Sequence, residues 1–451
     1  MALFGTDGAR GVANRELTVE MALAIGKSAG ALWGPGTRVV VARDTRTSSG
    51  MLEAGVAAGL TALGVEVEMA GMVPTPALAY LIKSTAADGG AMISASHNPP
   101  RYNGIKLLDG LGRKWPPERE AAVEASMEDA AQLSVEPEQI APIRHLEDDA
   151  VLGYRQFLVQ NFWGRIDPLN VVVDLAHGAA ISTAVPVLEA LGVKVSAIHA
   201  EECGERINQA SGATHPEALQ HAVRERNADL GFAFDGDADR LIAVDEQGHI
   251  VDGDAVLYVL ACGLKRRGEL AGGQVVATVM SNLGLERALA AEGIRLARTP
   301  VGDRWVAERM QEIGAVLGGE QSGHVILKQW LETGDGLLTA LAVMAEMRSS
   351  RHSLAELTAP LERYPQVLHN VRLTTPLEDW SRLARLKQRV AEAERDLGSD
   401  GRVLIRPSGT EPLLRVMVEG RDREHIETWA RRLVQSVEEE LGARGIQTPT
   451  V

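Results

Sequence analysis

One pattern occurs three times in this chain of 451 residues, and it limits the folds that are possible. A β-branched run is followed by a polar loop, a helical stretch, a glycine and a second apolar run, starting at residues 38–42, 171–174 and 275–280. Such a unit joins two parallel strands through a right-handed crossover. Three of them predict an α/β fold with three consecutive α/β domains and mixed, largely parallel sheets. The glycines are Gly64, Gly192 and Gly293.

The C-terminal part of the chain follows a different order. Strand-like runs lie at residues 367–373, 403–405 and 414–418, and helical stripes of apolar residues lie at 380–390 and 426–437. The order β-α-β-β-α predicts a small α+β domain with helices on one face of an antiparallel sheet.

Segments with proline and charge but without periodicity separate these parts, at residues 137–149 and 359–366. They are typical of linkers. A further boundary is placed near Asp252. We therefore expect four domains, at residues 1–145, 150–250, 251–362 and 366–446.

The composition excludes several classes of function. The chain has 61 acidic and 46 basic residues, a formal net charge of −15, which argues against binding nucleic acid or an anionic membrane. No apolar run approaches the roughly 18 residues that span a bilayer, and early charges at Asp7, Glu16 and Glu20 argue against a signal peptide. Cys203 and Cys262 are too few for a disulfide framework. We expect a cytoplasmic protein.

Three aspartates stand at alternate positions in one short loop between two apolar runs: Asp235, Asp237 and Asp239. Carboxylates at this spacing can converge on one hard cation, and an all-oxygen set favours Mg²⁺ or Ca²⁺ over zinc. An EF-hand is excluded, because Arg240 stands where that loop needs glycine and strands flank the loop. The alternative, a solvated acidic turn, would crowd three like charges without benefit.

A serine directly follows another apolar run. Ser96 lies in the segment 94–99, after residues 91–93, and His97 is its neighbour. A serine at the end of a buried strand is placed as a nucleophile would be. Nearby, Lys106 offers an ammonium for phosphate binding or proton transfer. The alternatives are an ordinary turn for the serine and a surface cation for the lysine.

Another loop gathers donors for an anion. Two guanidinium groups, two hydroxyls and the backbone N–H groups beside a glycine favour bidentate binding of a phosphate. A Pro/Gly turn without a ligand is the alternative. The residues concerned are Arg406, Ser408, Gly409, Thr410 and Arg415.

The last of these loops carries Glu320, Ser322 and His324 after a strand-like run. Carboxylate and hydroxyl groups suit the hydroxyls of a sugar, and the histidine suits acid–base work. A nucleophile, a cation site, a phosphate site and a polyol site together favour phosphoryl transfer on a phosphosugar.

In order and position, these loops resemble those of the α-D-phosphohexomutase superfamily over the whole chain. Gln321 and the segment 407–409 resemble the branch of that superfamily that acts on glucosamine phosphates. The similar segments are 4–11, 94–99, 235–240, 319–324 and 406–412. Departures that preserve the spacing are Arg101, Tyr102, His177 and Ala238.

The resemblance implies four domains around a central active-site cleft and a role for each loop. Ser96 would be the phosphoserine. It would bind one Mg²⁺ together with Asp235, Asp237 and Asp239. The transferring phosphate would be met by Arg10, Lys106 and His324. The sugar would be met by Glu320, Ser322, Gly302 and Asp303. The non-reacting phosphate would be held by Arg406, Ser408, Gly409, Thr410 and Arg415.

The activity that the resemblance implies is the isomerisation of glucosamine 6-phosphate to glucosamine 1-phosphate. The route passes through the phosphoserine and a 1,6-bisphosphate, with hexose 1,6-bisphosphate as activator, and leads to UDP-N-acetylglucosamine and cell-wall precursors. The superfamily also suggests a homodimer. Two alternatives remain: a phosphoglucomutase or phosphomannomutase of the same fold, and a sugar-phosphate-binding regulator without catalysis.

Overall fold

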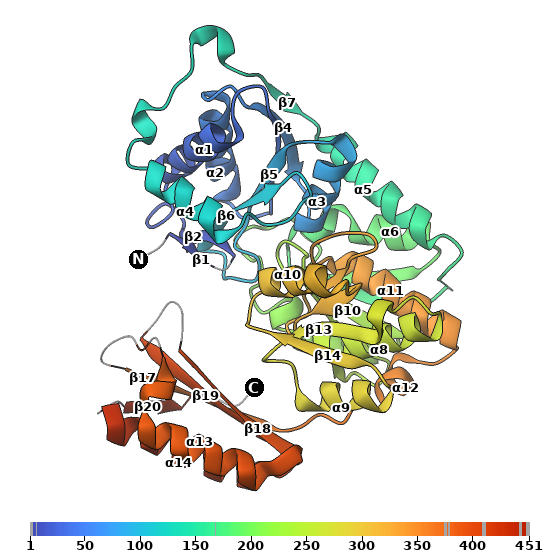
Figure 1. Cartoon of the computed structure of the whole chain (residues 1–451). Coiled ribbons are helices and arrows are strands. Elements are labelled where there is room, and N and C mark those ends of the chain that lie inside the picture. Colours follow the sequence, from blue (N-terminus) through green and yellow to red (C-terminus); the bar gives the residue numbers. More distant parts are fainter. Residues whose placement is uncertain are drawn as a thin grey trace. The chain divides into compact units, whose positions relative to one another are not determined.

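The computed structural model describes residues 3–5, 7–166, 168–373, 377, 379–407, 412–441 and 444–447, excluding the side chains of residues 147, 148 and 444–447. By their contacts, the residues fall into two compact units (Figure 1). The first comprises Met1–Met280 and Glu292–Pro360, and the second comprises Ser281–Ala291 and Leu361–Val451. No described helix is long and apolar enough to cross a membrane.

The first sheet belongs to the N-terminal part of the first unit. Its strands are β1 (Phe4–Gly5), β2 (Gly8–Val12), β3 (Arg38–Arg43), β4 (Glu66–Met72), β5 (Gly89–Ile93), β6 (Tyr102–Asp109) and β7 (Ile143–His145). Its helices are α1 (Val19–Trp33), α2 (Ser49–Thr61), α3 (Thr75–Thr85), α4 (Pro117–Ser126) and α5 (Glu147–Phe162). The strand order is β1-β2-β6-β5-β3-β4-β7.

The centre of this sheet is parallel. Strand β3 pairs in parallel with β4 and β5, whereas β6 pairs antiparallel with β5 and β2. Val39, Val40 and Val41 of β3 are fully buried, as expected for a parallel strand that is covered on both faces. Figure 1 shows α1 and α2 on one side of the sheet and α3 and α5 on the other.

Two further mixed sheets complete the first unit. One has the order β12-β11-β10-β8-β9 and the other the order β14-β13-β15-β16. The strands are β8 (Asn170–Asp174), β9 (Lys194–Ile198), β10 (Leu230–Phe234), β11 (Leu241–Asp245), β12 (Ile250–Val251), β13 (Gln274–Thr278), β14 (Arg295–Thr299), β15 (Leu317–Gly319) and β16 (Val325–Leu327). The helices are α6 (Ala184–Ala190), α7 (Glu217–Glu225), α8 (Gly253–Arg266), α10 (Asp303–Ile313), α11 (Gly336–Ser350) and α12 (Leu354–Thr358).

The three predicted repeats are present, and their glycines take the left-handed conformation that ends a helix at little cost. The φ angles of Gly64, Gly192 and Gly293 are 76°, 84° and 65°. The helix of the third repeat, α9 (Leu283–Ala291), belongs to the second unit. The segment predicted as the first linker contains β7, which pairs with β4. All of β7 is exposed, so it lacks the apolar alternation that would have indicated a strand.

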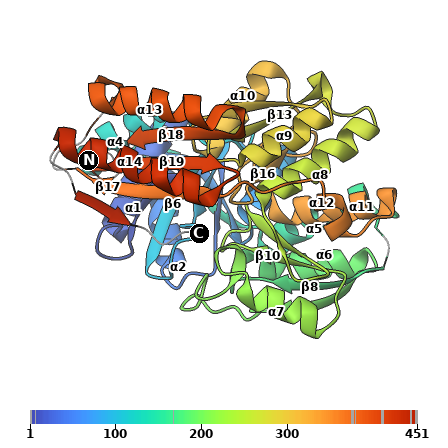
Figure 2. The same cartoon turned by 90° about the horizontal axis from the view of Figure 1, so that it is seen from below.

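The second unit has the predicted α+β architecture. Its strands are β17 (Gln366–Arg372), β18 (Gly401–Pro407), β19 (Leu413–Gly420) and β20 (Arg444–Gln447), and its longer helices are α13 (Ala384–Leu397) and α14 (Arg423–Leu441). The strands are antiparallel in the order β18-β19-β17-β20. Figure 2 shows α13 and α14 side by side across the strands. The edge strand β20 was not predicted.

The mixed sheets place the candidate residues at equivalent strand ends. Strands β5, β10 and β15 each pair in parallel with a neighbour, namely β3, β8 and β13. Ser96, Asp235 and Glu320 follow the carboxyl ends of these strands. In open α/β sheets ligands bind at these ends.

Candidate active site

The predicted nucleophile is buried and faces the aspartate loop. Ser96 is 0% exposed, and its Oγ donates a hydrogen bond to Oδ2 of Asp235 at 2.6 Å. Nδ1 of His97 lies 3.2 Å from the same Oγ. The φ angle of Ser96 is 52°, a left-handed value that is uncommon for a residue with a Cβ. The residue is therefore held in a conformation that a free loop would rarely adopt.

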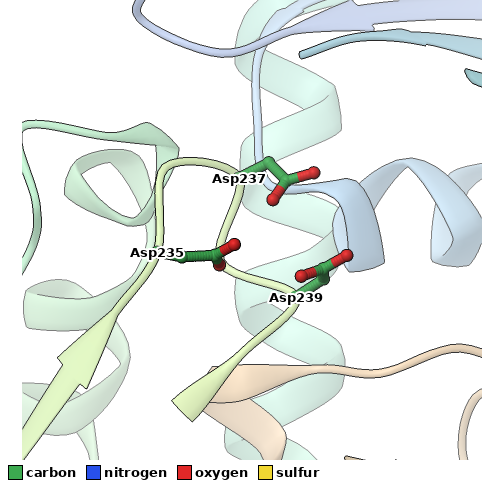
Figure 3. A group of neighbouring side chains, drawn as sticks. All are labelled: Asp235, Asp237 and Asp239. Atoms are coloured by element: carbon green, nitrogen blue, oxygen red, sulfur yellow. The ribbon is translucent and has the colours of Figure 1, made fainter. Parts of the chain in front are cut away.

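The three aspartates meet as predicted. Asp235, Asp237 and Asp239 lie on the loop between β10 and β11, and one oxygen of each lies within 4.8 Å of the others. The side chains converge from a single turn (Figure 3). Ala238, between the second and third aspartates, has a φ of 57°, and this left-handed residue bends the loop so that alternate side chains share one side.

The electrostatics of this loop suit a cation. Burial, and then the charges of Asp239 and Asp237, raise the pKa of Asp235 to about 8. Oδ1 of Asp237 and Oδ1 of Asp239 are buried, and neither has a hydrogen-bond partner in the part of the chain that the structure describes. Buried carboxylate oxygens without partners are costly. A divalent cation with oxygen ligands would satisfy them, so the donor set fits Mg²⁺.

Two cations from the first sheet face this loop. Nζ of Lys106, on β6, donates to Oδ2 of Asp237 at 2.7 Å and lies 3.6 Å from Oδ2 of Asp239. Burial opposes the charge of Lys106, but the two carboxylates outweigh it and raise the pKa of the ammonium. Arg10, on β2, donates to Oδ1 of Asn98 at 3.1 Å. Gly104 leaves room for it, because a Cβ there would lie 3.1 Å from Cγ of Arg10.

The predicted histidine is also at this site. His324 is 2% exposed, and its Nδ1 lies 3.6 Å from Oδ2 of Asp239. Its Nε2 accepts a hydrogen bond from the backbone N–H of Gly334 at 3.0 Å. In this arrangement the proton of the neutral ring is on Nδ1 and points toward the aspartate.

The two loops that were predicted to meet the sugar lie together. The backbone N–H of Gly302 donates to Oε1 of Glu320 at 3.1 Å. Asp303 is held in an ion pair, with its Oδ2 2.6 Å from Nζ of Lys114. Ser322 is exposed on the turn between β15 and β16. Glu320 and Ser322 are thus accessible to a ligand, whereas Asp303 is engaged.

The predicted phosphate loop lies in the second unit. Arg406 on β18 stands opposite Arg415 on β19 in the antiparallel register. Burial, and then the charge of Arg415, lower the pKa of Arg406. Nε of Arg415 is buried and has no hydrogen-bond partner among the described residues. This cationic pair therefore suits an anion. Ser408, Gly409 and Thr410 lie outside the described residues.

Sequence reasoning missed two side chains that contact these groups. Lys114 forms ion pairs with Asp7 and with Asp303. Thr75 donates from its Oγ1 to Oδ2 of Asp237 at 2.6 Å. Neither residue stands in a recognisable motif, and their partners lie 107 or more positions away along the chain.

Models of the domains of one protein family match most of the chain. The family is described as phosphoglucomutase/phosphomannomutase. Its alpha/beta/alpha domain I matches residues 1–134, domain II matches 153–248, domain III matches 252–364, and the C-terminal domain matches 368–436.

Curated relatives resolve the branch of this family. Phosphoglucosamine mutase of Caldanaerobacter subterraneus subsp. tengcongensis is 47% identical over 445 residues, which cover 97% of this chain and 99% of the relative. Phosphoglucosamine mutase of Bacillus subtilis is 44% identical, with coverage of 97% and 99%. The chain belongs to the phosphoglucosamine mutase family.

A solved structure agrees with membership of the broader phosphoglucomutase/phosphomannomutase family. A phosphoglucomutase/phosphomannomutase family protein from Burkholderia thailandensis matches with a TM-score of 0.83 at 26% identity, and 97% of each chain is covered. The predicted superfamily and α/β fold are confirmed. A mutase is an isomerase, so the prediction of an enzyme is confirmed as well.

Proposed function

We propose that the chain interconverts glucosamine 6-phosphate and glucosamine 1-phosphate through a phosphoserine at Ser96 and a glucosamine 1,6-bisphosphate. The observation that supports this most is the 2.6 Å hydrogen bond from Ser96 Oγ to Asp235, within a cluster of three carboxylates. A regulator that only bound a sugar phosphate would need no nucleophile beside a cation site. Two relatives named phosphoglucosamine mutase are 47% and 44% identical to this chain over nearly its full length.

The reaction consists of two phosphoryl transfers. In the first, the bond between Ser96 Oγ and phosphorus breaks, and the phosphoryl group bonds to the C1 hydroxyl of glucosamine 6-phosphate, which releases its proton. The bisphosphate then turns so that its C6 phosphate faces Ser96. In the second transfer the bond between the C6 oxygen and phosphorus breaks and this phosphoryl group bonds to Oγ of Ser96. The C6 oxygen takes up a proton, and glucosamine 1-phosphate leaves. The enzyme ends as it began, phosphorylated.

Charge stabilisation is the main task of the residues around Ser96, because phosphoryl transfer needs little covalent help from a protein. Lys106 and Arg10 would balance the charge on the transferring group. The raised pKa of Lys106 keeps it a cation, so it would act as a charge partner and not as a base. The ring of His324 would stabilise Asp239 through its Nδ1.

Asp235, Asp237 and Asp239, with the phosphate on Ser96, would hold one Mg²⁺. When bound, this ion supplies positive charge to the phosphate oxygens. Thr75 and Lys106 both contact Oδ2 of Asp237 and would keep its other oxygen turned toward the cation.

Binding of the rest of the substrate would be divided between two groups of residues. Glu320 and Ser322 would contact the sugar hydroxyls, with the loop at Gly302 and Asp303 beside them. Arg406 and Arg415, with Ser408, Gly409 and Thr410, would hold the phosphate that does not react. An anchor of this kind accepts either phosphate, which the turning bisphosphate requires.

We further propose that a hexose 1,6-bisphosphate primes Ser96, that the enzyme is a cytoplasmic homodimer, and that its product feeds the synthesis of UDP-N-acetylglucosamine. These proposals rest on the resemblance to the superfamily. The domain boundaries at residues 1–145, 150–250, 251–362 and 366–446 also stay predictions.

The test compares kcat/KM for the 6-phosphates of glucosamine, glucose and mannose, with Mg²⁺ and a catalytic amount of glucose 1,6-bisphosphate. We expect a clear preference for the amino sugar. Equal or better rates on a neutral sugar would instead indicate a phosphoglucomutase or phosphomannomutase.

Ser96→Ala should lack turnover and the phosphate mass of about 80 Da, while Ser84→Ala, on an exposed part of α3, should keep both. Normal turnover in Ser96→Ala would refute the proposal.

A further inference from the structure

The guanidinium of Arg46 is buried behind the nucleophile loop, and all of its N–H groups are bonded. The side chain is 0% exposed, and Nε donates to Oδ2 of Asp44 at 2.9 Å. The two terminal nitrogens donate to four backbone carbonyls of the segment 96–102. The acceptors are the carbonyl oxygens of Ser96, Asn98, Pro99 and Tyr102, at 2.9, 2.7, 2.7 and 2.9 Å.

A second residue, which lies in a loop of a different sheet, donates hydrogen bonds to two of the same carbonyls. Asn208 is 5% exposed, and its Nδ2 donates to the carbonyls of Ser96 at 2.8 Å and Asn98 at 3.2 Å. Its own backbone N–H bonds to the carbonyl of Ala176 at 3.0 Å. The carbonyl of Ser96 thus receives one donor from the loop after β3 and one from the segment after β9.

The aspartate loop packs against the same carbonyl. A Cβ at Gly236 would lie 2.7 Å from the carbonyl oxygen of Ser96 and 2.9 Å from Nδ2 of Asn208. Such a contact is too close, so glycine is needed there. The backbone between Asp235 and Asp237 therefore touches the peptide group whose orientation Arg46 and Asn208 fix.

Asp44 restrains the chain on the other side of the nucleophile. Besides Arg46, it accepts hydrogen bonds from Oγ of Ser49 and Oγ of Ser94, both at 2.7 Å. Oγ of Ser94 in turn accepts the backbone N–H of Ser96 at 2.9 Å. The N–H and the carbonyl of Ser96 are both bonded into this buried network.

We propose that Arg46 and Asn208 are positioning residues that hold Ser96 at its left-handed φ of 52° and thereby aim its Oγ at Asp235. A residue with a Cβ keeps such a conformation only when its surroundings enforce it. Without these donors the peptide relaxes toward negative φ and Oγ moves away from the aspartate loop. The inference rests on the proposed function, because it assumes that Ser96 carries the transferring phosphoryl group.

The expected signature is a loss of rate without a loss of substrate affinity. Phosphoryl transfer depends on alignment of the reacting atoms. The sugar and the non-reacting phosphate, in contrast, are bound by other loops. An interaction that acts only on the reacting geometry changes kcat and leaves KM nearly unchanged.

Two variants test this. Arg46→Lys keeps the charge beside Asp44, but one ammonium cannot reach four carbonyls. Asn208→Ala removes only the second donor. The matched control is Arg38→Lys at the start of β3, where the guanidinium also bonds a backbone carbonyl, that of Thr85, and pairs with a carboxylate.

Each variant is assayed for kcat and KM with glucosamine 6-phosphate, well below its Tm. The rate at which glucose 1,6-bisphosphate phosphorylates the dephosphorylated enzyme is followed by intact mass, with Ser96→Ala as the blank, so that the gain of phosphate on Ser96 is measured apart from turnover. We expect both kcat and the phosphorylation rate to fall about tenfold or more in Arg46→Lys and by a smaller factor in Asn208→Ala. KM should change less than about threefold, and Arg38→Lys should match the wild type.

Folded variants with wild-type kcat and phosphorylation rate would overturn the inference, even if their Tm were lower, because that pattern marks a purely structural role. A rise in KM with unchanged kcat would overturn it as well. If Arg46→Lys does not fold, Asn208→Ala still decides the question. A wild-type enzyme that gained no phosphate on Ser96 from glucose 1,6-bisphosphate would instead refute the proposed function itself.

Discussion

Nζ of Lys106 lies 2.7 Å from Oδ2 of Asp237, although 131 positions separate the two residues in the chain. The lysine is on β6 of the first sheet and the aspartate follows β10 of the second. The pair is buried, with side-chain exposures of 1% and 0%. It therefore joins a strand of the first sheet to a loop of the second at the point where the proposed chemistry occurs.

Lys106→Met should lower kcat about 100-fold or more, because it removes a preorganised positive charge from the transfer step. The change should exceed any change in KM. Steady-state kinetics with glucosamine 6-phosphate check this, with Lys83→Met on the exposed part of α3 as the control. A variant with normal kcat would show that Lys106 serves only the packing of the two sheets.

Divalent cations should stabilise the folded protein. The three carboxylates converge only in the native state, so Mg²⁺ binds that state selectively and raises Tm with its concentration. In Asp235→Asn the increase should be strongly reduced, whereas Asp129→Asn, at an exposed position, should behave as the wild type. Thermal unfolding over a Mg²⁺ series, after chelation, gives the comparison. An equal increase in all three proteins would place the cation elsewhere.

Stability should depend on pH through Asp335, which caps α11 and accepts a hydrogen bond from the hydroxyl of Tyr154 at 2.7 Å. Burial raises the pKa of this carboxyl to about 6. The folded state thus binds its proton more tightly than the unfolded state, so this group's contribution to stability is present below about pH 4 and is lost as pH rises to about 6.

The matched variant is Asp335→Asn, which keeps a capping oxygen but cannot titrate. The free energy of unfolding of the variant minus that of the wild type should increase by about 2–3 kcal/mol between about pH 4 and pH 7. Urea denaturation across this range measures the difference. Parallel curves for the two proteins would contradict the assignment.

The opposed guanidinium groups of Arg406 and Arg415 should make substrate binding sensitive to either residue. Arg406→Ala should raise KM more than it lowers kcat, because an anchor used in both the ground state and the transition state contributes uniform binding. Arg372→Ala, on β17 of the same sheet, is the control. An unchanged KM in Arg406→Ala would mean that the phosphate is held elsewhere.

Much of the site was predictable because strand ends are marked in the sequence. An apolar, strand-like run followed directly by small or charged residues located Ser96, the aspartate loop and Glu320. Spacing alone predicted that alternate aspartates converge. The long-range contacts were not predictable in this way. The bonds of Thr75 to Asp237 and of Arg46 to the nucleophile loop depend on how separate loops meet, and one sequence holds no signal for that.

The fold was predicted correctly where burial produces a regular spacing of apolar residues along the sequence. The inner strands and the amphipathic helices of the second unit have clear apolar patterns. The edge strands β7 and β20 were missed, because a short strand that pairs on one side has little apolar character to show. The sequence also did not indicate that α9 belongs to the second unit, because a helical pattern gives no information about which sheet the helix packs against.

The second unit is discontinuous, and this restricts how the gene could be recombined. The side-chain amide of Asn282 donates to the carbonyl of Tyr364 at 2.9 Å and accepts its backbone N–H at 3.0 Å, and Glu419 accepts the N–H of Leu283 at 2.8 Å. A chimera that exchanged only the residues after 360 would combine the sheet of a foreign protein with α9 of this chain. An inherited or engineered swap of this unit must therefore carry Ser281–Ala291 with it.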